Sequence, residues 1–221
     1  MTSRQPFKLP FRRGPKDGRA SSEPPFDPTS WSGALIVMLV FAAVIWAIQI
    51  ANAHHDYAYN RFGLKPRELD GLWGIGTQPF LHESYGHLLS NTVALLGIGW
   101  VLMLSGLRVW LFVTATVIVL GGFATWLVAP SNTVIVGASG LVFGWLGYLL
   151  ARAYFTRRLK WIFTAVVLLV FFGTLLGSLL PTVNARVSWQ SHVCGFLAGI
   201  FIGWLLHPRK GSARTRRAPV G

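Results

Sequence analysis

A serine and a histidine that each open an apolar segment are the residues of this chain best suited to chemistry. Ser139 begins the segment 139–155, and His192 begins the segment 192–206. A serine hydroxyl is a weak nucleophile until a base removes its proton, and an imidazole within hydrogen-bond reach is the usual base. Polar side chains are costly inside apolar segments, so the presence of both residues indicates a functional role. We therefore predict that Ser139 is a nucleophile and that His192 is its general base.

The residues around Ser139 predict a place that favours negative charge. Gly137, Ala138, Ser139 and Gly140 form a turn of small residues that opens a helix. The first turn of a helix has free backbone N–H groups, and the helix dipole adds to their attraction for an anion. The tetrahedral oxyanion that forms when a serine attacks a carbonyl carbon needs donors of this kind.

Two further polar side chains fit the same chemistry. His87 and Asn91 are four residues apart, so they share one face of the apolar segment 86–104. Both side chains can donate hydrogen bonds to one oxyanion, together with the backbone N–H of Ser139. The five apolar segments after residue 85 contain no Asp or Glu. The histidine base would therefore work without a carboxylate to orient it.

The composition predicts that these residues lie in a membrane protein. Of the 221 residues, 52% are hydrophobic and only 12% are charged. A helix needs about 20 apolar residues to cross the hydrocarbon core of about 30 Å. Six segments of that kind are predicted as spanning helices, and they cover residues 31–53, 86–104, 110–129, 139–155, 161–180 and 192–206. The expected fold class is an all-α membrane protein with six transmembrane helices.

The positive charges predict how the six helices are oriented. One side of the predicted membrane carries 16 Lys and Arg residues, in both tails and in the turns at Arg108 and at 152–160, against 4 on the other side. This asymmetry predicts that both termini face the cytoplasm. It also accounts for the net charge of +13 without a nucleic-acid partner.

The orientation places the candidate residues at one depth. The segments at 86, 139 and 192 all begin at the outer side and run inward. From Ser139 to the basic residues near Arg157 the helix rises about 25 Å at about 1.5 Å per residue. Because the hydrocarbon core is about 30 Å thick, the site is predicted to lie several Å below the outer surface.

The rest of the chain is predicted to support this unit. Residues 1–30 are predicted to be a basic, Pro-rich, disordered cytosolic tail, residues 31–208 a single six-span domain, and residues 209–221 a basic cytosolic tail. The aromatic-rich segment 60–85 is expected to lie in the membrane interface. The single cysteine excludes an intramolecular disulfide. No pattern in the sequence predicts a metal ion or a cofactor.

Glycine spacing predicts which helices pack together. Gly140, Gly144 and Gly147 share one face of the fourth span, and Gly195 and Gly199 follow His192 on the sixth. Small residues at such spacing let two membrane helices approach closely. This contact would bring the helix of Ser139 against the helix of His192.

Three motifs in this order resemble those of the rhomboid intramembrane proteases. They are a His-x4-His-x3-Asn run, a Gly-x-Ser-Gly turn and a His-x2-Gly-x3-Gly helix, and here they are His82, His87 and Asn91, then Gly137 to Gly140, then His192, Gly195 and Gly199. The resemblance implies a six-helix bundle of the bacterial type in which a Ser-His dyad cleaves single-span membrane proteins near the outer face. It further implies that substrates approach beside the fifth span, and that the oxyanion hole consists of His87, Asn91 and the Ser139 N–H.

The chain departs from the family pattern at two positions. Rhomboids often have a Trp-Arg pair in the first loop, whereas Trp73 is followed by Gly74 here. Many bacterial members have a tyrosine that stacks on the histidine, and Phe143 occupies that place. The serine and the histidine, which inactive relatives usually lose, are both present.

Two other functions remain open on the sequence. One is a rhomboid-like protein that binds membrane clients without cutting them. The other is a small transporter, although the chain has no internal repeat and its polar groups gather near one surface instead of the midplane. The expected partners are transmembrane protein substrates and membrane lipids, and the expected location is a bacterial plasma membrane. The substrate, the preferred cleavage residue and the oligomeric state are not predicted.

Overall fold

The computed structural model describes residues 27–28, 30–181 and 188–207. The predicted basic tails therefore lie outside the described residues, apart from positions 27, 28 and 30. Arg186, which contributes to the charge count of the outer side, also lies outside them.

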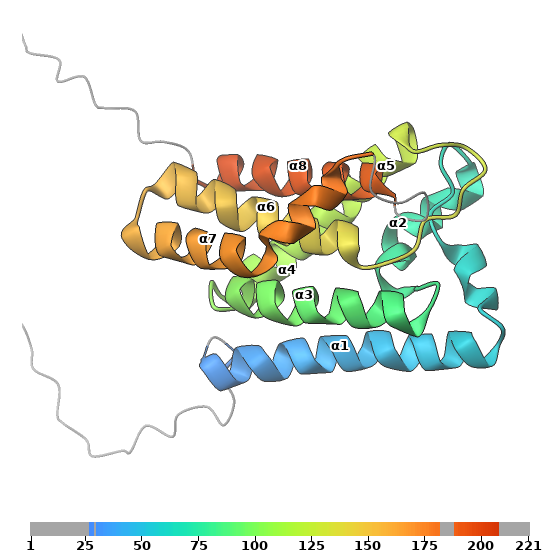
Figure 1. Ribbon diagram of the computed structural model, residues 1–221, viewed down its shortest axis with the longest axis horizontal. Helices are drawn as coiled ribbons and strands as arrows, with labels where there is room; N and C mark the ends of the chain where they lie inside the picture. The colour runs from blue at the N-terminus through green and yellow to red at the C-terminus, as the bar shows by residue number, and fades with distance from the viewer. Residues whose placement is uncertain (1–26, 29, 182–187, 208–221) are drawn as a thin grey trace, which may run out of the picture.

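Most of the described residues are in helices (Figure 1). The bundle consists of these elements, some of which join end to end: α1 (Trp31–His54), α3 (Tyr85–Met103), α4 (Leu107–Thr116), the π-helical turn η4 (Val117–Gly121), α5 (Gly122–Val128), α6 (Ser139–Thr156), α7 (Leu159–Phe172), the 3-10 segment η5 (Gly173–Leu179) and α8 (Trp189–Leu206). Between α1 and α3, a folded loop contains η1 (Ala58–Phe62), η2 (Leu69–Trp73), α2 (Gly74–Thr77) and η3 (Gln78–Phe80). Among the described residues, β pairing is limited to one antiparallel bridge between Leu64 and Ile135.

Five helices of the described chain are long and apolar enough to cross a membrane. They are α1, α3, the continuous α4–η4–α5 helix, the α7–η5 helix and α8. This agrees with the predicted all-α membrane protein. The helix α6, which was predicted as the fourth of six spans, is not among the five, so the count of six and the orientation of the termini stay predictions.

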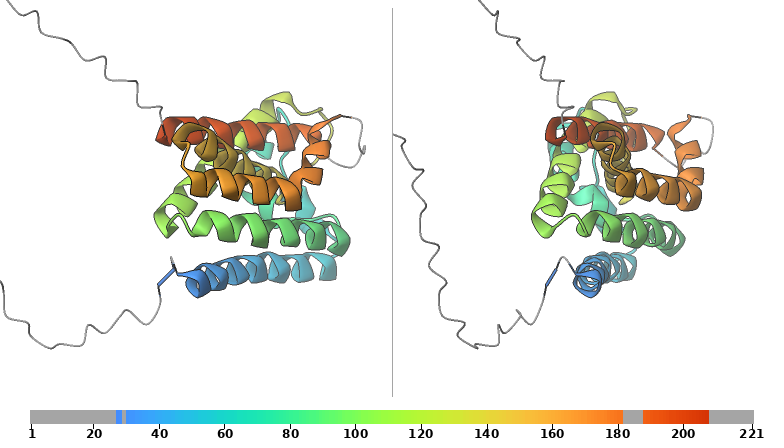
Figure 2. Two further views of the ribbon diagram at one scale, coloured as in Figure 1. Left: turned by 60° about the vertical axis from the view of Figure 1, so that its left-hand side comes forward. Right: turned by 90° about the vertical axis from the view of Figure 1, so that its left-hand side faces the viewer.

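The position of α6 explains its lower apolar content. The end-on view in Figure 2 shows α6 inside the bundle, next to α3, α4, α7 and α8, whereas α1 lies at one side of the bundle beside α3. Every residue from Leu141 to Leu149 is buried, including the large side chains Trp145 and Tyr148. A helix enclosed by other helices can use glycines and polar aromatic side chains, because it does not face lipid.

The fifth span changes character near its end. The α-helical part of the segment predicted at 161–180 ends at Phe172, and the chain continues as a 3-10 segment up to Leu179. Gly173 and Gly177 lie in this segment, and glycine is a poor helix former. The same segment forms one wall of the candidate site described below.

The glycine faces make the closest helix contact of the structure. A Cβ atom on Gly195 would overlap the backbone oxygen of Gly140, and one on Gly199 would overlap that of Gly144. Likewise, a Cβ on Gly147 would overlap the backbone oxygen of Phe196. The backbones of α6 and α8 are therefore in direct contact, and residues larger than glycine would separate the two helices.

Replacement of Gly199 by alanine tests this contact. The added methyl group would lie 2.8 Å from the Tyr148 backbone nitrogen, where no flexible side chain is present to yield. We expect Gly199→Ala to destabilise the fold by roughly 1–3 kcal/mol, seen as a lower thermal-unfolding midpoint in detergent.

The matched control is Gly173→Ala, in the span that packs less tightly. A Cβ at Gly173 meets no atom within 4 Å, so this variant should keep the midpoint of the wild type. Equal losses in the two variants would show that the α6–α8 contact has no special weight.

Candidate active site

The structure brings Ser139 and His192 into hydrogen-bond contact. Ser139 is the first residue of α6, and His192 lies in the first turn of α8, where Ser188 caps the helix by accepting a hydrogen bond from the Ser191 N–H. The Ser139 Oγ and the His192 Nε2 are 2.9 Å apart. His192 is 5% exposed, so its ring is held among protein atoms. The distance suits transfer of the serine proton to the imidazole.

The other ring nitrogen of His192 is held by Ser178 in η5. His192 Nδ1 lies 3.1 Å from the Ser178 backbone oxygen and 3.1 Å from the Ser178 Oγ. The Ser178 hydroxyl donates to the Leu175 carbonyl at 2.8 Å, so both Ser178 oxygens can accept at the imidazole. This arrangement assigns the ring proton to Nδ1 and leaves a lone pair on Nε2, toward Ser139.

The sequence reasoning missed Ser178. A backbone carbonyl has no signature in the sequence, and the apolar character of the fifth span drew attention away from its few polar residues. The available signal was a serine near the end of a span that contains little else that is polar. The prediction that the base works without a carboxylate stays compatible with this geometry, because a main-chain oxygen takes the place that a carboxylate often has.

The ring of Phe143 lies against His192. The two ring centroids are 4.5 Å apart with an interplanar angle of 27°, which is a stacked arrangement. Phe143 follows Ser139 by about one helical turn, so α6 supplies both the hydroxyl and the ring that limits movement of the imidazole. The stacking expected of the family's tyrosine is therefore available from a phenyl ring.

His87 and Asn91 face the turn that precedes Ser139. Ser84 caps α3 by accepting a hydrogen bond from the His87 N–H at 3.1 Å, which places His87 in the first turn. A Cβ atom on Gly137 would lie 2.9 Å from the His87 Nε2 and 3.5 Å from the Asn91 Nδ2. Gly137 has a φ of +123°, and its lack of a side chain leaves both donors room beside the turn.

A cavity of about 430 Å³ joins these groups. His87, Asn91, Ser139, Phe143, Ser178 and His192 are among the residues that line it. Asn91 is 8% exposed, and its Nδ2 is a buried donor without a partner among the described residues. A buried donor is costly unless it has an acceptor, so the cavity is suited to a ligand that offers an oxygen there. The described residues contain no group of three or more His, Cys, Asp or Glu side chains that could hold a metal ion.

His82 forms a hydrogen bond to the turn that precedes Ser139. The His82 Nε2 accepts a hydrogen bond from the Ala138 N–H at 3.4 Å, and the His82 carbonyl accepts one from the Asn60 side chain at 3.3 Å. Burial, with a smaller contribution from the charge of His87, lowers the pKa of His82 to about 3. Neutral His82 can keep its Nε2 as the acceptor, so it holds the turn just before Ser139 at ordinary pH.

Arg67 anchors the loop between α1 and α3. The Arg67 guanidinium donates to the Leu127 carbonyl at 2.9 Å and to the Ala129 carbonyl at 2.7 Å, at the end of α5. Carbonyl groups at a helix C-terminus have no partner inside the helix, and a cation there is favourable. The bridge between Leu64 and Ile135 ties the same loop to the strand-like segment that leads into Gly137.

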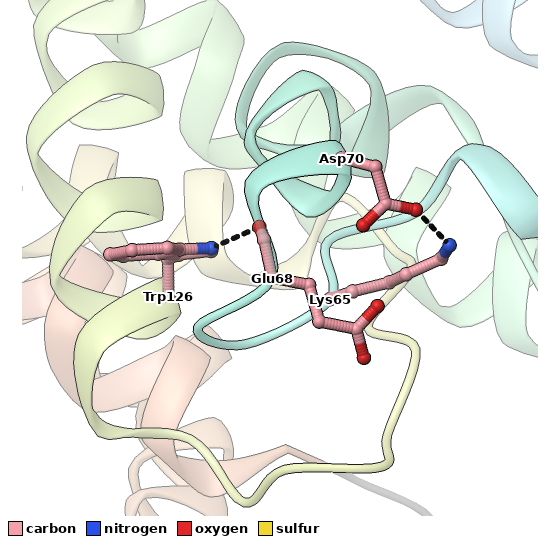
Figure 3. A network of polar contacts seen from close by, with 4 residues as sticks. All are labelled: Lys65, Glu68, Asp70 and Trp126. Atoms are coloured by element: carbon pink, nitrogen blue, oxygen red, sulfur yellow. Dashed lines mark hydrogen bonds and ion pairs between the residues drawn. The ribbon is translucent and has the colours of Figure 1, made fainter.

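Figure 3 shows two further contacts of this loop. The Trp126 Nε1 donates to the Glu68 carbonyl at 2.9 Å, and Lys65 forms an ion pair with Asp70 at 2.6 Å. Gly74, one of the departures from the family pattern, packs so closely on the Leu64 backbone that a Cβ atom would overlap it. An arginine at position 74 would not fit this loop, and Arg67 provides a cationic anchor instead.

Comparisons with known proteins identify one family and several relatives. A model of the family described as "Rhomboid domain" matches residues 69–209. An uncharacterized protein of Mycobacterium leprae is 35% identical over 192 residues, which is 84% of this chain and 76% of that protein. An uncharacterized protein of Mycobacterium tuberculosis strain H37Rv is 35% identical over 194 residues, covering 84% and 80% of the two chains. The RHOMBOID-like protein 5 of Arabidopsis thaliana is 29% identical over 158 residues, covering 67% of this chain and 49% of that protein.

The pKa of His82 predicts an acid-sensitive turn. Because its pKa in the folded state lies below the ordinary value of 6.5, the unfolded chain binds the proton first as the pH falls. The contribution of His82 to stability is therefore full above pH 6.5 and is lost as the pH falls toward about 3. Thermal-unfolding midpoints measured in detergent from neutral to acid pH would follow this loss.

The variant His82→Gln isolates the contribution of this histidine. A glutamine side-chain oxygen can accept the Ala138 N–H but does not titrate. We expect a smaller acid-dependent fall of the midpoint in His82→Gln than in the wild type. Parallel falls in both proteins would assign the acid sensitivity to other groups.

Proposed function

Because the chain belongs to the rhomboid family, we propose that it is an intramembrane serine endopeptidase that cuts membrane-spanning segments of other proteins. The observation that carries the proposal is the hydrogen bond of 2.9 Å between the Ser139 Oγ and the His192 Nε2, at the wall of a cavity that also exposes His87 and Asn91. A structural serine and histidine would not need to share a cavity with a buried donor that lacks a partner.

In the proposed first step, Ser139 attacks the carbonyl carbon of the scissile peptide bond. The Oγ forms the new bond to carbon, and its proton passes to the His192 Nε2. The Ser178 carbonyl accepts from the Nδ1–H and stabilises the imidazolium that results, as the third member of a triad does. Stacking on Phe143 keeps the ring in the plane that reaches Ser139.

The negative charge on the substrate oxygen would be met by three donors. These are the Ser139 backbone N–H, the His87 imidazole and the Asn91 side-chain amide. Donors that are already in place cost no reorganisation when the charge develops, which is why an oxyanion hole contributes strongly to the rate. The unpartnered Asn91 Nδ2 fits this role, because the oxyanion would be its acceptor.

The second half of the reaction returns the enzyme to its resting state. His192 gives its proton to the leaving amine, and the peptide C–N bond breaks to leave an acyl group on Ser139. A water molecule then attacks the acyl carbon while the His192 Nε2 takes one of its protons. The bond from that carbon to the Ser139 Oγ breaks, the imidazolium returns the proton to the Oγ, and the carboxylic acid is released. With the orientation predicted from the charge count, both steps would take place near the outer face of the membrane.

Loss of either member of the dyad should abolish cleavage. We expect a model single-span substrate, reconstituted with the purified protein, to be cut by the wild type and to stay intact with Ser139→Ala or His192→Ala. The control is Thr116→Val on α4, because its hydroxyl bonds only to the Phe112 carbonyl of its own helix among the described residues. Mass spectrometry of the fragments gives the cleavage site.

A fluorophosphonate probe separates the protease from a binding protein without activity. Labelling at Ser139 that disappears in His192→Ala requires a hydroxyl activated by the imidazole. Absence of labelling in a wild-type protein that still captures the substrate would overturn the proposed activity and favour the binding protein.

Removal of one oxyanion donor should slow the reaction without preventing binding. We expect Asn91→Ala to lower kcat by about 10²–10³-fold and to change KM much less, because the lost hydrogen bond is made chiefly in the transition state. The variant should elute from a size-exclusion column at the same volume as the wild type, which shows that it is folded. A kcat within threefold of the wild type would exclude Asn91 from the oxyanion hole.

A further inference from the structure

The turn between α6 and α7 gathers positive charge at the end of the bundle away from the candidate active site. Arg157, Arg158 and Lys160 lie within four residues and are all exposed. Figure 1 shows this turn at the same end as the start of α1 and the end of α8, whereas the starts of α6 and α8, with Ser139 and His192, lie at the opposite end. Arg157 ends α6 with a φ of +51°, which turns the chain sharply into α7.

No ion pair is formed by this turn among the described residues. All seven Asp and Glu residues of the chain lie at or before Glu83. The one ion pair among the described residues joins Lys65 to Asp70, in the loop at the opposite end of the bundle. Burial, together with the charges of Arg152 and Arg158, lowers the pKa of His207 at the end of α8. The charge of Arg158 therefore reaches the neighbouring helix end, although its effect on His207 is smaller than that of burial.

An apolar groove begins directly at this turn. It has a volume of about 420 Å³ and is lined by Ala153, Tyr154, Arg157, Ile162, Ala165, Val166 and Leu169. One wall is the last turn of α6, the other is the outward face of α7, and Arg157 is the one charged residue of the lining. From Ile162 to Leu169 the helix rises about 10 Å, so the groove runs along a substantial part of one leaflet.

The face of α7 beside the groove is open. Leu168 is the one buried residue of α7, while Val166 is 52% exposed and Ile162 is 42% exposed. An exposed apolar surface of this kind on a spanning helix faces lipid chains. The groove differs from the rest of this surface because it is hollowed and ends at Arg157, which forms no ion pair among the described residues.

We propose that the groove and the turn form a binding site for one anionic phospholipid. An acyl chain would lie in the groove between α6 and α7, and the phosphate would bind beside Arg157, with Arg158 and Lys160 adding to the attraction. A guanidinium is well suited to phosphate because it donates two parallel hydrogen bonds. With the orientation predicted from the charge count, the lipid would belong to the cytoplasmic leaflet. The proposal does not depend on the proposed proteolytic activity.

The experiment measures which lipid stays bound to the full chain. The protein is reconstituted in nanodiscs that contain equal amounts of dioleoyl phosphatidylglycerol and dioleoyl phosphatidylcholine, and native mass spectrometry then counts the lipids that remain. For the wild type we expect one phosphatidylglycerol to be retained at least about tenfold more often than phosphatidylcholine, since each basic residue near an anionic headgroup contributes roughly fivefold.

The charge arm removes two cations of the turn. Arg157→Asn combined with Arg158→Gln should abolish the preference for phosphatidylglycerol, and asparagine tolerates the positive φ at position 157. Its control is Arg61→Gln combined with Lys65→Gln, which removes the same charge from the loop at the opposite end, where Arg61 is exposed and Lys65 is half-buried. The control should keep the preference of the wild type.

The groove arm leaves every charge in place. Val166→Trp fills the groove and should reduce retention of phosphatidylglycerol, while Val170→Trp adds the same ring to an exposed position of α7 outside the lining. All four variants should unfold at the temperature of the wild type in neutral detergent, which separates lost binding from lost folding.

Three results would overturn the proposal. Equal retention of the two lipids by the wild type would show that no selective site exists. Equal effects of the two charge variants would show that the preference depends on the net charge of the protein and not on this turn. Equal effects of the two tryptophan variants would leave a headgroup attraction without a groove. Loss of the preference in both test variants, with both controls unchanged, supports the site.

Discussion

The direct backbone contact between α6 and α8 is the interaction on which the rest of the structure depends. Gly195 and Gly199 lie against the carbonyl oxygens of Gly140 and Gly144, and no side chain separates the two helices. A hydrogen bond of 2.9 Å between side chains on two helices requires that their axes stay at one separation. The glycine pairs provide this separation within two turns of both Ser139 and His192.

The contact also explains why the bundle can bury polar groups near its end. Once α6 and α8 are in contact, α3 brings His87 and Asn91 to the turn before Ser139, and η5 brings the Ser178 oxygens to the far side of His192. Each of these groups would be costly in lipid, but here they line one cavity of the protein, and the Ser178 oxygens have a partner in His192. The Asn91 Nδ2 and the His82 Nδ1 are buried without a hydrogen-bond partner among the described residues, and Asn91 lines the cavity, where an acceptor could enter.

The two ends of the bundle use charge in different ways. At the end with the candidate active site, the Arg67 guanidinium satisfies carbonyl groups at the end of α5 and so serves the fold. At the other end, Arg157, Arg158 and Lys160 have no acidic residue of the chain near them in the sequence. Arg67 is bound to the protein itself, whereas the three basic residues of the turn are exposed. Some of the excess positive charge thus stabilises the fold, and some of it is exposed at the surface of the protein.

The sequence by itself determined what depends on the geometry of a single helix. His87 and Asn91 share a face because four residues make about one helical turn, and the glycine faces of α6 and α8 follow from the same period. The length of the apolar segments predicted an all-helical membrane protein, and the three motifs predicted the rhomboid family, which the family match confirms. Only the tertiary structure decided which backbone groups meet side chains. It placed the Ser178 carbonyl at His192, Arg67 at the end of α5, and α6 inside the bundle, where it needs fewer apolar residues than a helix exposed to lipid. The physical reason is that a main-chain oxygen has the same chemistry at every residue, so its role follows from the path of the chain and not from the residue type.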